Sequence, residues 1–216
     1  MNRYDMFPHI EDCMSMTLRE WILFHNVMHR HYTRYKGRKV LKPPFDWIVL
    51  GDIIEDTNPQ VIIEIGTFEG GAALWMADLV QSLGRDCPVI SIDIRDCTGG
   101  AQHQGVKWVR GNAADQTTLD EVKKLIGNRR GMVIEDSDHK EHVTSKLLEM
   151  YAPLIAPGCY FIVEDTICEF TGLPPFPGPL GAVKAFVAQH PEFIIDRSSE
   201  KYVMTYNPMG YLLRQK

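Results

Sequence analysis

The chain has 216 residues, a formal net charge of −5, 44% hydrophobic residues and 24% charged residues. This length allows one well-buried core but is short for two, and the composition is that of an ordinary globular domain. The acidic balance argues against nucleic-acid binding, which usually needs a basic face. No apolar run approaches the roughly 18–20 residues that span a bilayer, and the first twenty residues lack the apolar core of a secretory signal. We therefore expect a cytoplasmic protein with no nucleic-acid or membrane partner.

The cysteines are odd in number, widely spaced and never arranged as CxxC or beside histidines: Cys13, Cys87, Cys97, Cys159 and Cys168. Neither a disulfide framework nor a zinc site is predicted from such a distribution.

Residues 1–44 are predicted to form a helical extension ahead of a main domain at 45–216. Apolar side chains recur at helical spacing in this part, at Trp21, Phe24, Val27 and Met28. They would face either the core or a partner, so a homo-oligomer stays among the alternatives. The basic stretch 29–42 is interpreted as a solvated helix end and loop rather than as part of a site. Lys42-Pro43-Pro44 marks the passage into the main domain.

From Val61 onward, short apolar runs alternate with amphipathic helical patterns, which is typical of βα units with a mostly parallel sheet. Strands are predicted at 61–66, 89–94, 106–110, 132–136 and 160–165. Helices are predicted at 70–83, 117–126, 142–151 and 182–189. The segments 193–197 and 202–213 are predicted to close the sheet as an antiparallel pair. The predicted fold is a doubly wound α/β domain.

Ligands bind such sheets beyond the carboxyl ends of the strands. The first strand runs into Glu64, Gly66, Thr67 and Gly70 with the spacing E-x-G-x-x-x-G-G, where glycine allows close approach of a ligand or merely a tight turn. Asp93 ends the second strand, at a position where a carboxylate can bind the two hydroxyls of a ribose. The alternative is that Asp93 caps a helix or is an ordinary loop acid. Asn112 follows the third strand and could face an adenine edge.

Acidic side chains follow the fourth and fifth strands. Asp136 and His139 lie in the sequence EDSDH, and Glu164 and Asp165 lie in EDT. Carboxylates gathered at neighbouring strand ends repel one another unless a cation or protons neutralise them, and oxygen ligands suit Mg²⁺. His139 could act as a general base. The alternatives are solvated acids at strand ends and a structural histidine.

Several motifs in fixed order carry a resemblance to a known family over about residues 40–214: IIEIGTFEGGAALWMADLV, ISIDIR, VIEDSDH, YAPLIAPGCYFIVEDT, PGPLGAV and NPMGYLLR. Together they resemble the cephalosporin hydroxylase / rhamnosyl O-methyltransferase family. The resemblance implies a Rossmann-like class I methyltransferase fold, with a seven-stranded, mostly parallel sheet and a C-terminal antiparallel hairpin. Similar macrolide sugar O-methyltransferases place a metal-binding Asp three residues before a catalytic His, and an acidic pair after the next strand.

The resemblance implies three sets of site residues. S-adenosylmethionine would contact Glu64, Gly66, Thr67, Gly70, Asp93, Asn112 and Asp136. Mg²⁺ would bind Asp136, Glu164 and Asp165, while His139 and Asp136 would be catalytic.

The expected reaction is methyl transfer to a hydroxyl of a sugar, such as rhamnose or a related deoxysugar on a glycan or glycosylated metabolite. The segment 170–179 (FTGLPPFPGP) would cover this acceptor or simply connect two elements. One alternative is methylation of a catechol-like acceptor, because a metal ion can chelate a catechol in the same way as a vicinal diol. The other alternative is a non-catalytic accessory protein.

Overall fold

A computed structural model describes residues 10–96 and 102–215 of the chain. Its main feature is a seven-stranded sheet with the order β5-β4-β3-β6-β7-β9-β8. The strands are β3 (Ile62–Ile65), β4 (Val89–Asp93), β5 (Val106–Arg110), β6 (Met132–Glu135), β7 (Tyr160–Val163), β8 (Phe193–Ile195) and β9 (Tyr211–Arg214). The first five pair in parallel, whereas β9 is antiparallel to both β7 and β8. The expected α/β sheet with an antiparallel C-terminal hairpin is confirmed.

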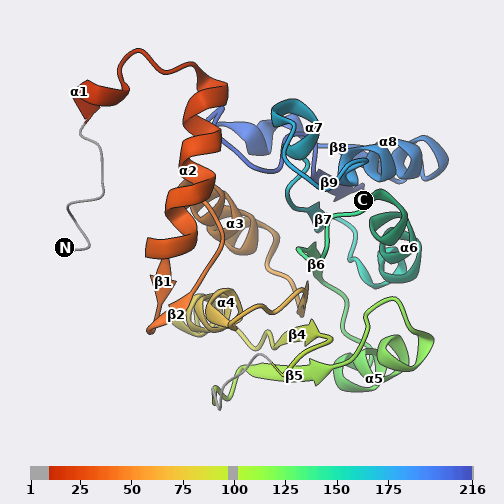
Figure 1. The fold of residues 1–216 in the computed structure, drawn as a ribbon. Helices are drawn as coiled ribbons and strands as arrows, with labels where there is room; N and C mark the ends of the chain where they lie inside the picture. Colours follow the sequence, from red (N-terminus) through yellow and green to blue (C-terminus); the bar gives the residue numbers. More distant parts are fainter. Residues whose placement is uncertain (1–9, 97–101, 216) are drawn as a thin grey trace.

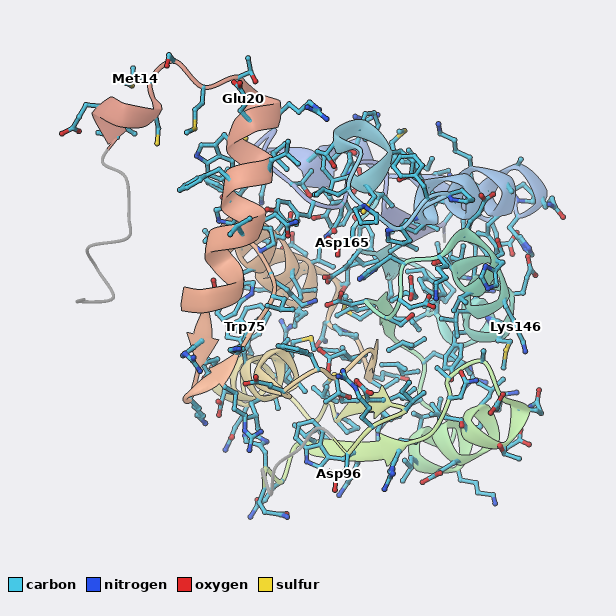
Figure 2. The ribbon with its side chains drawn as sticks, viewed as in Figure 1. Met14, Glu20, Trp75, Asp96, Lys146 and Asp165 are labelled. Carbon is cyan, nitrogen blue, oxygen red and sulfur yellow. The ribbon has the colours of Figure 1, made fainter. Side chains whose placement is uncertain are left out.

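The central strands are buried on both faces, which explains their nearly continuous apolar sequences. Every residue of β3 is buried, and Ile62 pairs with Val89 on one side and Met132 on the other. Figure 1 shows α3 (Pro44–Thr57) and α4 (Gly71–Ser82) on one face of the sheet. The opposite face carries α5 (Gln116–Ile126), α6 (Glu141–Tyr151) and α8 (Pro179–Gln189). Side chains fill the space between these layers (Figure 2).

The chain order of the strands reverses at β3. The chain passes outward from β3 to β4 and β5, and then returns to β6 on the other side of β3. Such a switch point opens a crevice at the carboxyl ends of the strands. Gly66, Asp136, Glu164 and Asp165 lie just past their strands rather than inside them, so all four belong to loops at this edge.

The N-terminal part consists of α1 (Ile10–Cys13), α2 (Leu18–Tyr32) and a hairpin of β1 (Arg34–Tyr35) and β2 (Arg38–Lys39). The predicted helical stripe lies on α2, where Val27 is 58% exposed, while the neighbouring Ile22 packs with Trp21 against Ile167 and Tyr206. The predicted domain boundary at residue 44 coincides with the start of α3 and stays a prediction.

The long last strand predicted at 202–213 is wrong in extent. Residues 197–200 form a 3₁₀ turn and β9 begins at Tyr211. Val203 and Met209 have positive φ angles of 64° and 62°, and Pro208 has no amide to donate, so the intervening segment cannot extend as a strand.

Two further expectations concern absences. Within 10–96 and 102–215, no helix combines the length and the apolar composition needed to cross a membrane. Cys13, Cys87, Cys159 and Cys168 are free thiols, while Cys97 lies outside the described residues.

Candidate active site

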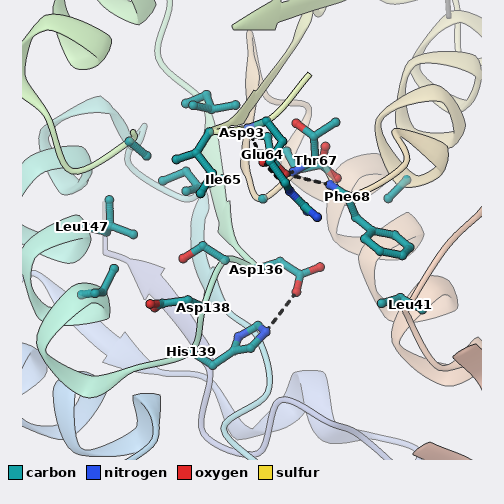
Figure 3. Close-up of a pocket in the computed structure, with 18 of the residues that line it drawn as sticks. Leu41, Glu64, Ile65, Thr67, Phe68, Asp93, Asp136, Asp138, His139 and Leu147 are labelled. Carbon is teal, nitrogen blue, oxygen red and sulfur yellow. Dashed lines mark hydrogen bonds and ion pairs between the residues drawn. The ribbon is translucent and has the colours of Figure 1, made fainter. Parts of the chain in front are cut away.

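A cavity of about 540 Å³ lies at the switch point, beyond the ends of β3, β4, β5 and β6 (Figure 3). Loops from the strand ends form most of its wall. The rest of the wall comes from residues 39–42 at the end of the N-terminal hairpin, from Ala72 on α4, and from Val143 and Leu147 on α6. Its size falls in the range of small-molecule and cofactor sites.

The cavity brings together most of the residues predicted to contact a cofactor. They come from four strand ends that are far apart in sequence: Glu64, Gly66, Thr67, Asp93, Asn112 and Asp136. Gly70 is absent from this wall. It is the N-cap residue immediately before α4, with φ 78°, and a Cβ there would lie 3.0 Å from the Trp108 ring. Its expected contact with the cofactor stays a prediction.

Backbone geometry requires a glycine at position 66, in addition to its place in the cavity wall. Its φ is 101°, and a Cβ atom would lie 1.9 Å from the carbonyl oxygen of Asp136. A side chain would therefore push apart the turns that follow β3 and β6. Glycine is required here for backbone packing, whether or not a ligand approaches it.

Asp93 holds the turn after β3. Its Oδ2 accepts hydrogen bonds from the amides of Thr67 (3.2 Å) and Phe68 (3.1 Å), and its Oδ1 accepts one from the amide of Arg95 (2.9 Å). The carboxylate thus has the loop-fixing role that was the alternative to ribose binding. It also lines the cavity, so the two roles are compatible.

Glu64 is buried at the bottom of the site. It accepts a hydrogen bond from the Ser91 hydroxyl, which also contacts the Thr67 hydroxyl at 2.7 Å. Desolvation raises the pKa of Glu64 to about 7, against the opposing effect of Lys42. A proton and a nearby cation therefore compete to neutralise this carboxyl group.

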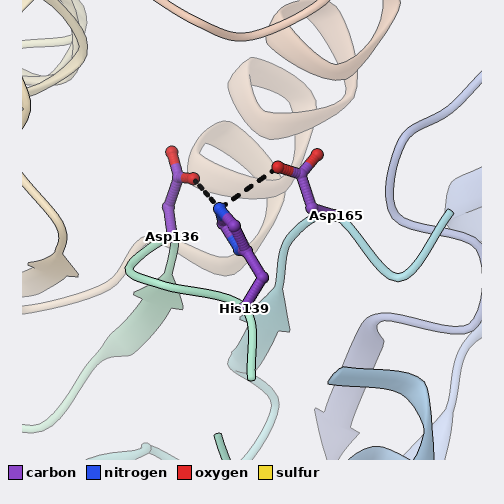
Figure 4. A group of neighbouring side chains, drawn as sticks. All are labelled: Asp136, His139 and Asp165. Carbon is purple, nitrogen blue, oxygen red and sulfur yellow. Dashed lines mark ion pairs between the residues drawn. The ribbon is translucent and has the colours of Figure 1, made fainter. Parts of the chain in front are cut away.

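Asp136, His139 and Asp165 form a compact group beside the cavity (Figure 4). One ligand atom from each lies within 4.8 Å of the others. Nε2 of His139 is 3.2 Å from Oδ2 of Asp165 and 3.8 Å from Oδ1 of Asp136. Burial opposes protonation of His139, but Asp165, Asp136 and Glu135 outweigh it and raise its pKa. The loops after β6 and β7 therefore converge, as their acidic sequences predict.

The loop that carries Asp136 and His139 is held from below by Glu135. This buried carboxyl group accepts hydrogen bonds from the amide of Ser137 (3.2 Å) and the hydroxyl of Thr144 (3.1 Å). His139 itself adopts φ 58°, an uncommon left-handed conformation for a non-glycine residue. A buried acid thus fixes a strained loop on which two of the predicted site residues lie.

The proline-rich segment 170–179 lies near this loop. The carbonyl of Pro177 accepts a hydrogen bond from the amide of Glu141, two residues after His139. None of its residues lines the cavity described above. Its role as a cover for an acceptor stays a prediction.

Glu164 is not a member of the compact group, and it contacts a lysine. Nζ of Lys42 lies 2.6 Å from both Glu164 carboxylate oxygens and 2.7 Å from Oδ2 of Asp136. Lys42 is 1% exposed. Burial alone would lower its pKa, but Asp136, Glu164 and Glu64 more than offset this and raise it. Lys42 belongs to the basic stretch 29–42, which was interpreted as solvated, and this interpretation is wrong for Lys42.

Comparison with known proteins shows which family the chain belongs to. The sequence model described as Rhamnosyl O-methyltransferase/CmcI matches residues 27–215. Among curated proteins, the rhamnosyl O-methyltransferase of Mycobacterium leprae is 27% identical over 193 residues, covering 85% of this chain and 83% of the relative. The rhamnosyl O-methyltransferase of Mycobacterium tuberculosis is 28% identical over 191 residues, covering 84% and 78%.

Solved structures support the fold. A CmcI structure with Mg and SAM aligns with a TM-score of 0.69 at 21% identity, covering all of this chain and 88% of that one. MycE, a methyltransferase of the mycinamycin biosynthetic pathway solved with Mg and SAH, aligns with a TM-score of 0.51 at 18% identity, covering 70% and 42%. The sheet, the strand-end motifs and these matches together identify the chain as a member of the Rhamnosyl O-methyltransferase/CmcI family, and so as the S-adenosylmethionine-dependent O-methyltransferase that its motifs predict.

Proposed function

We propose that the chain methylates a hydroxyl of a sugar, such as rhamnose or a related deoxysugar on a glycan or glycosylated metabolite. The methyl donor is S-adenosylmethionine, Mg²⁺ assists, and His139 is the general base. The observation that carries this proposal is the position of Asp136, which belongs both to the cavity wall and to the group with His139 and Asp165. A donor in the cavity and an acceptor at that group would be neighbours, as group transfer requires.

The cofactor contacts follow from the cavity wall. We assign the ribose to Asp93 and the adenine edge to Asn112, whose side chain follows β5. Glu64, Gly66, Thr67 and Asp136 line the space between them, and Gly70 contributes through the start of α4. Carboxylates in this wall suit the ribose hydroxyls and the positively charged sulfonium and amino groups of the cofactor.

The donor set fits a hard divalent cation. Asp136, Glu164 and Asp165 offer carboxylate oxygens from two adjacent loops, which is the ligand chemistry that Mg²⁺ prefers. When bound, the cation would lower the pKa of an acceptor hydroxyl and hold it in place. The likeness to CmcI and MycE, both solved with Mg, supports this assignment.

His139 would receive the acceptor proton at Nε2, the nitrogen that faces Asp165. The nearby carboxylates stabilise the imidazolium that results. The sulfonium of the donor is already activated, so orientation by the cavity and the two loops supplies much of the remaining rate.

The experiment is a methyl-transfer screen on rhamnosides, glycan-linked sugars and catechols, each with Mg²⁺ and with EDTA. We expect transfer to a sugar that EDTA abolishes and Mg²⁺ restores. Asp165→Asn should blunt the restoration. The control Asp138→Asn should not, because Asp138 lies on the same loop but pairs with Lys140 at 2.8 Å. Transfer to catechols alone would favour the alternative acceptor, and full turnover in EDTA would remove the metal from the proposal.

A further inference from the structure

Lys42 ends a short segment, residues 38–42, that we call the strap. The strap is fixed to the start of α4. Arg38 donates a hydrogen bond to the carbonyl of Glu69 (2.9 Å), and the amide of Lys39 donates one to its carboxylate (3.0 Å). Val40 packs so closely on Gly71 that a Cβ there would come within 2.5 Å of it. The strap is therefore a built part of the cavity wall.

The ammonium of Lys42 extends from this wall to the carboxylates that follow β6 and β7. It contacts both oxygens of Glu164 and one oxygen of Asp136, with Glu64 close enough to influence its charge. Buried charges are tolerated when they are paired and hydrogen-bonded. Lys42 thus neutralises carboxylates that would otherwise repel one another.

These contacts conflict with the expected metal site. The carboxylate oxygens that contact Lys42 belong to Asp136 and Glu164, two of the three residues assigned to Mg²⁺. The ammonium lies 2.6–2.7 Å from these oxygens, and a divalent ion bound to the same carboxylates would be repelled by it at short range. A divalent ion held by Glu164 would therefore be repelled by Lys42 in its observed position.

We propose that Lys42 is a resident counter-cation that competes with the divalent ion for Asp136 and Glu164. Ion binding releases the ammonium from Glu164, and the released residue belongs to the wall of the cofactor cavity. The inference rests on the divalent site of the proposed function. It assigns Lys42 as a positioning residue whose charge sets the affinity of that site.

The test is Mn²⁺ binding at fixed pH, measured by electron paramagnetic resonance on the full chain without cofactor. Lys42→Met keeps the length of the side chain and removes its charge. A charge within about 4–6 Å shifts the proton affinity of a carboxylate by about one to three powers of ten. We expect an effect of the same order on Mn²⁺, so Lys42→Met should bind Mn²⁺ at least about tenfold more tightly. Lys42→Arg should stay near wild type. Lys39→Met is the matched control. Lys39 lies on the same strap, but its ammonium is 3.9 Å from Glu69, which is not assigned to the metal. This variant should also bind Mn²⁺ like wild type.

Unchanged or weaker Mn²⁺ binding by Lys42→Met would overturn the competition, since a merely structural lysine would loosen the site when removed. If Lys42→Met does not fold, Lys42→Met with Glu164→Gln is compared with Glu164→Gln alone. The double variant should still bind Mn²⁺ more tightly, because Lys42 also contacts Asp136; equal binding would count against the competition. Absence of Mn²⁺ binding in every variant, wild type included, would instead defeat the metal site of the proposed function, and the inference with it.

Discussion

The main-chain amide of Asp165 donates a 3.1 Å hydrogen bond to Oδ1 of Asn207, which lies 42 residues later in the chain. Asp165 has a φ of 58°, so its backbone needs outside support. Asn207 is buried, and its own amide donates to the hydroxyl of Thr205 (2.9 Å). The C-terminal segment therefore sets the position of an acid on the loop after β7.

Asn207→Ala should consequently weaken metal binding although Asn207 is no ligand. Loss of the acceptor leaves a partly buried amide unpaired and should lower the free energy of unfolding by about 1–3 kcal/mol. We expect weaker Mn²⁺ binding by resonance titration as well. Thr166→Val is the control, because it removes a 2.7 Å bond to the carbonyl of Pro208, between the same two segments, without touching the amide of Asp165. Equal Mn²⁺ affinity in both variants would count against a positioning role for Asn207.

Asp93→Ala tests the cofactor side of the cavity. Because the carboxylate fixes the turn after β3 and is assigned to the ribose, the variant should lose both thermal stability and affinity. The expected loss in S-adenosylhomocysteine binding is about 1–3 kcal/mol, the range for hydrogen bonds to a charged group. Calorimetric titration measures it. Asp86→Ala, at a 91% exposed side chain, is the control and should change neither quantity. Lower stability with full affinity would make Asp93 a loop acid alone.

The strands could be predicted because their physical cause is local. A strand covered on both faces needs a nearly continuous apolar run, and the predicted strands that form β3, β4, β6 and β7 have one. The edge strand β5 differs, because its Lys107 and Arg110 are exposed. Helix α3 was not predicted, although Pro44 at its first turn and the buried Val49, Leu50, Ile53 and Ile54 carry a helical pattern. The C-terminal segment was misjudged for a different reason, because its path depends on bonds to distant residues such as Asp46.

The acidic group could be predicted because parallel strands bring their carboxyl ends to one edge. Asp136, His139 and Asp165 meet for that reason. Lys42 could not be predicted, since nothing near it in sequence distinguishes it from its basic neighbours. Its burial follows from contacts with residues 94 and 122 positions away. An excess of acids at the strand ends indicates that some cation is needed, but not that a lysine supplies part of it.

The stability of the chain should depend on pH through Asp46. This residue accepts hydrogen bonds from the hydroxyl of Thr205 (2.6 Å) and the amide of Tyr206 (2.9 Å). Desolvation nevertheless raises its pKa from 3.8 to about 6. The folded state therefore binds this proton more tightly than the unfolded state. The resulting stabilisation is complete below about pH 4 and is lost as pH rises through about 6.

A shift of this size corresponds to about 3 kcal/mol. An asparagine here would have no proton to lose, so Asp46→Asn should not show this loss of stability. The free energy of unfolding of the variant minus that of wild type should therefore increase as the pH rises from about 4 to about 7. Urea unfolding at several pH values measures the difference. Asp52→Asn, which removes one charge from the surface of the same helix, is the control. A difference between Asp46→Asn and wild type that stays constant with pH would contradict the raised pKa.

His139 can serve as a base or as a metal ligand, and its replacement separates the two roles. Its Nε2 lies within reach of both Asp136 and Asp165, so the geometry allows either. If His139 accepts the acceptor proton, His139→Ala should reduce kcat by about 10²–10⁴, and Mn²⁺ affinity should stay near wild type because the three carboxylates remain. If His139 is a ligand, the same variant should lose Mn²⁺ affinity first, and excess Mg²⁺ should restore much of its turnover.

His190→Ala is the matched control, because that histidine pairs with Glu149 at 3.0 Å at the far end of α8. It should alter neither kcat nor Mn²⁺ affinity. Normal turnover by folded His139→Ala would leave the proposed reaction without its base.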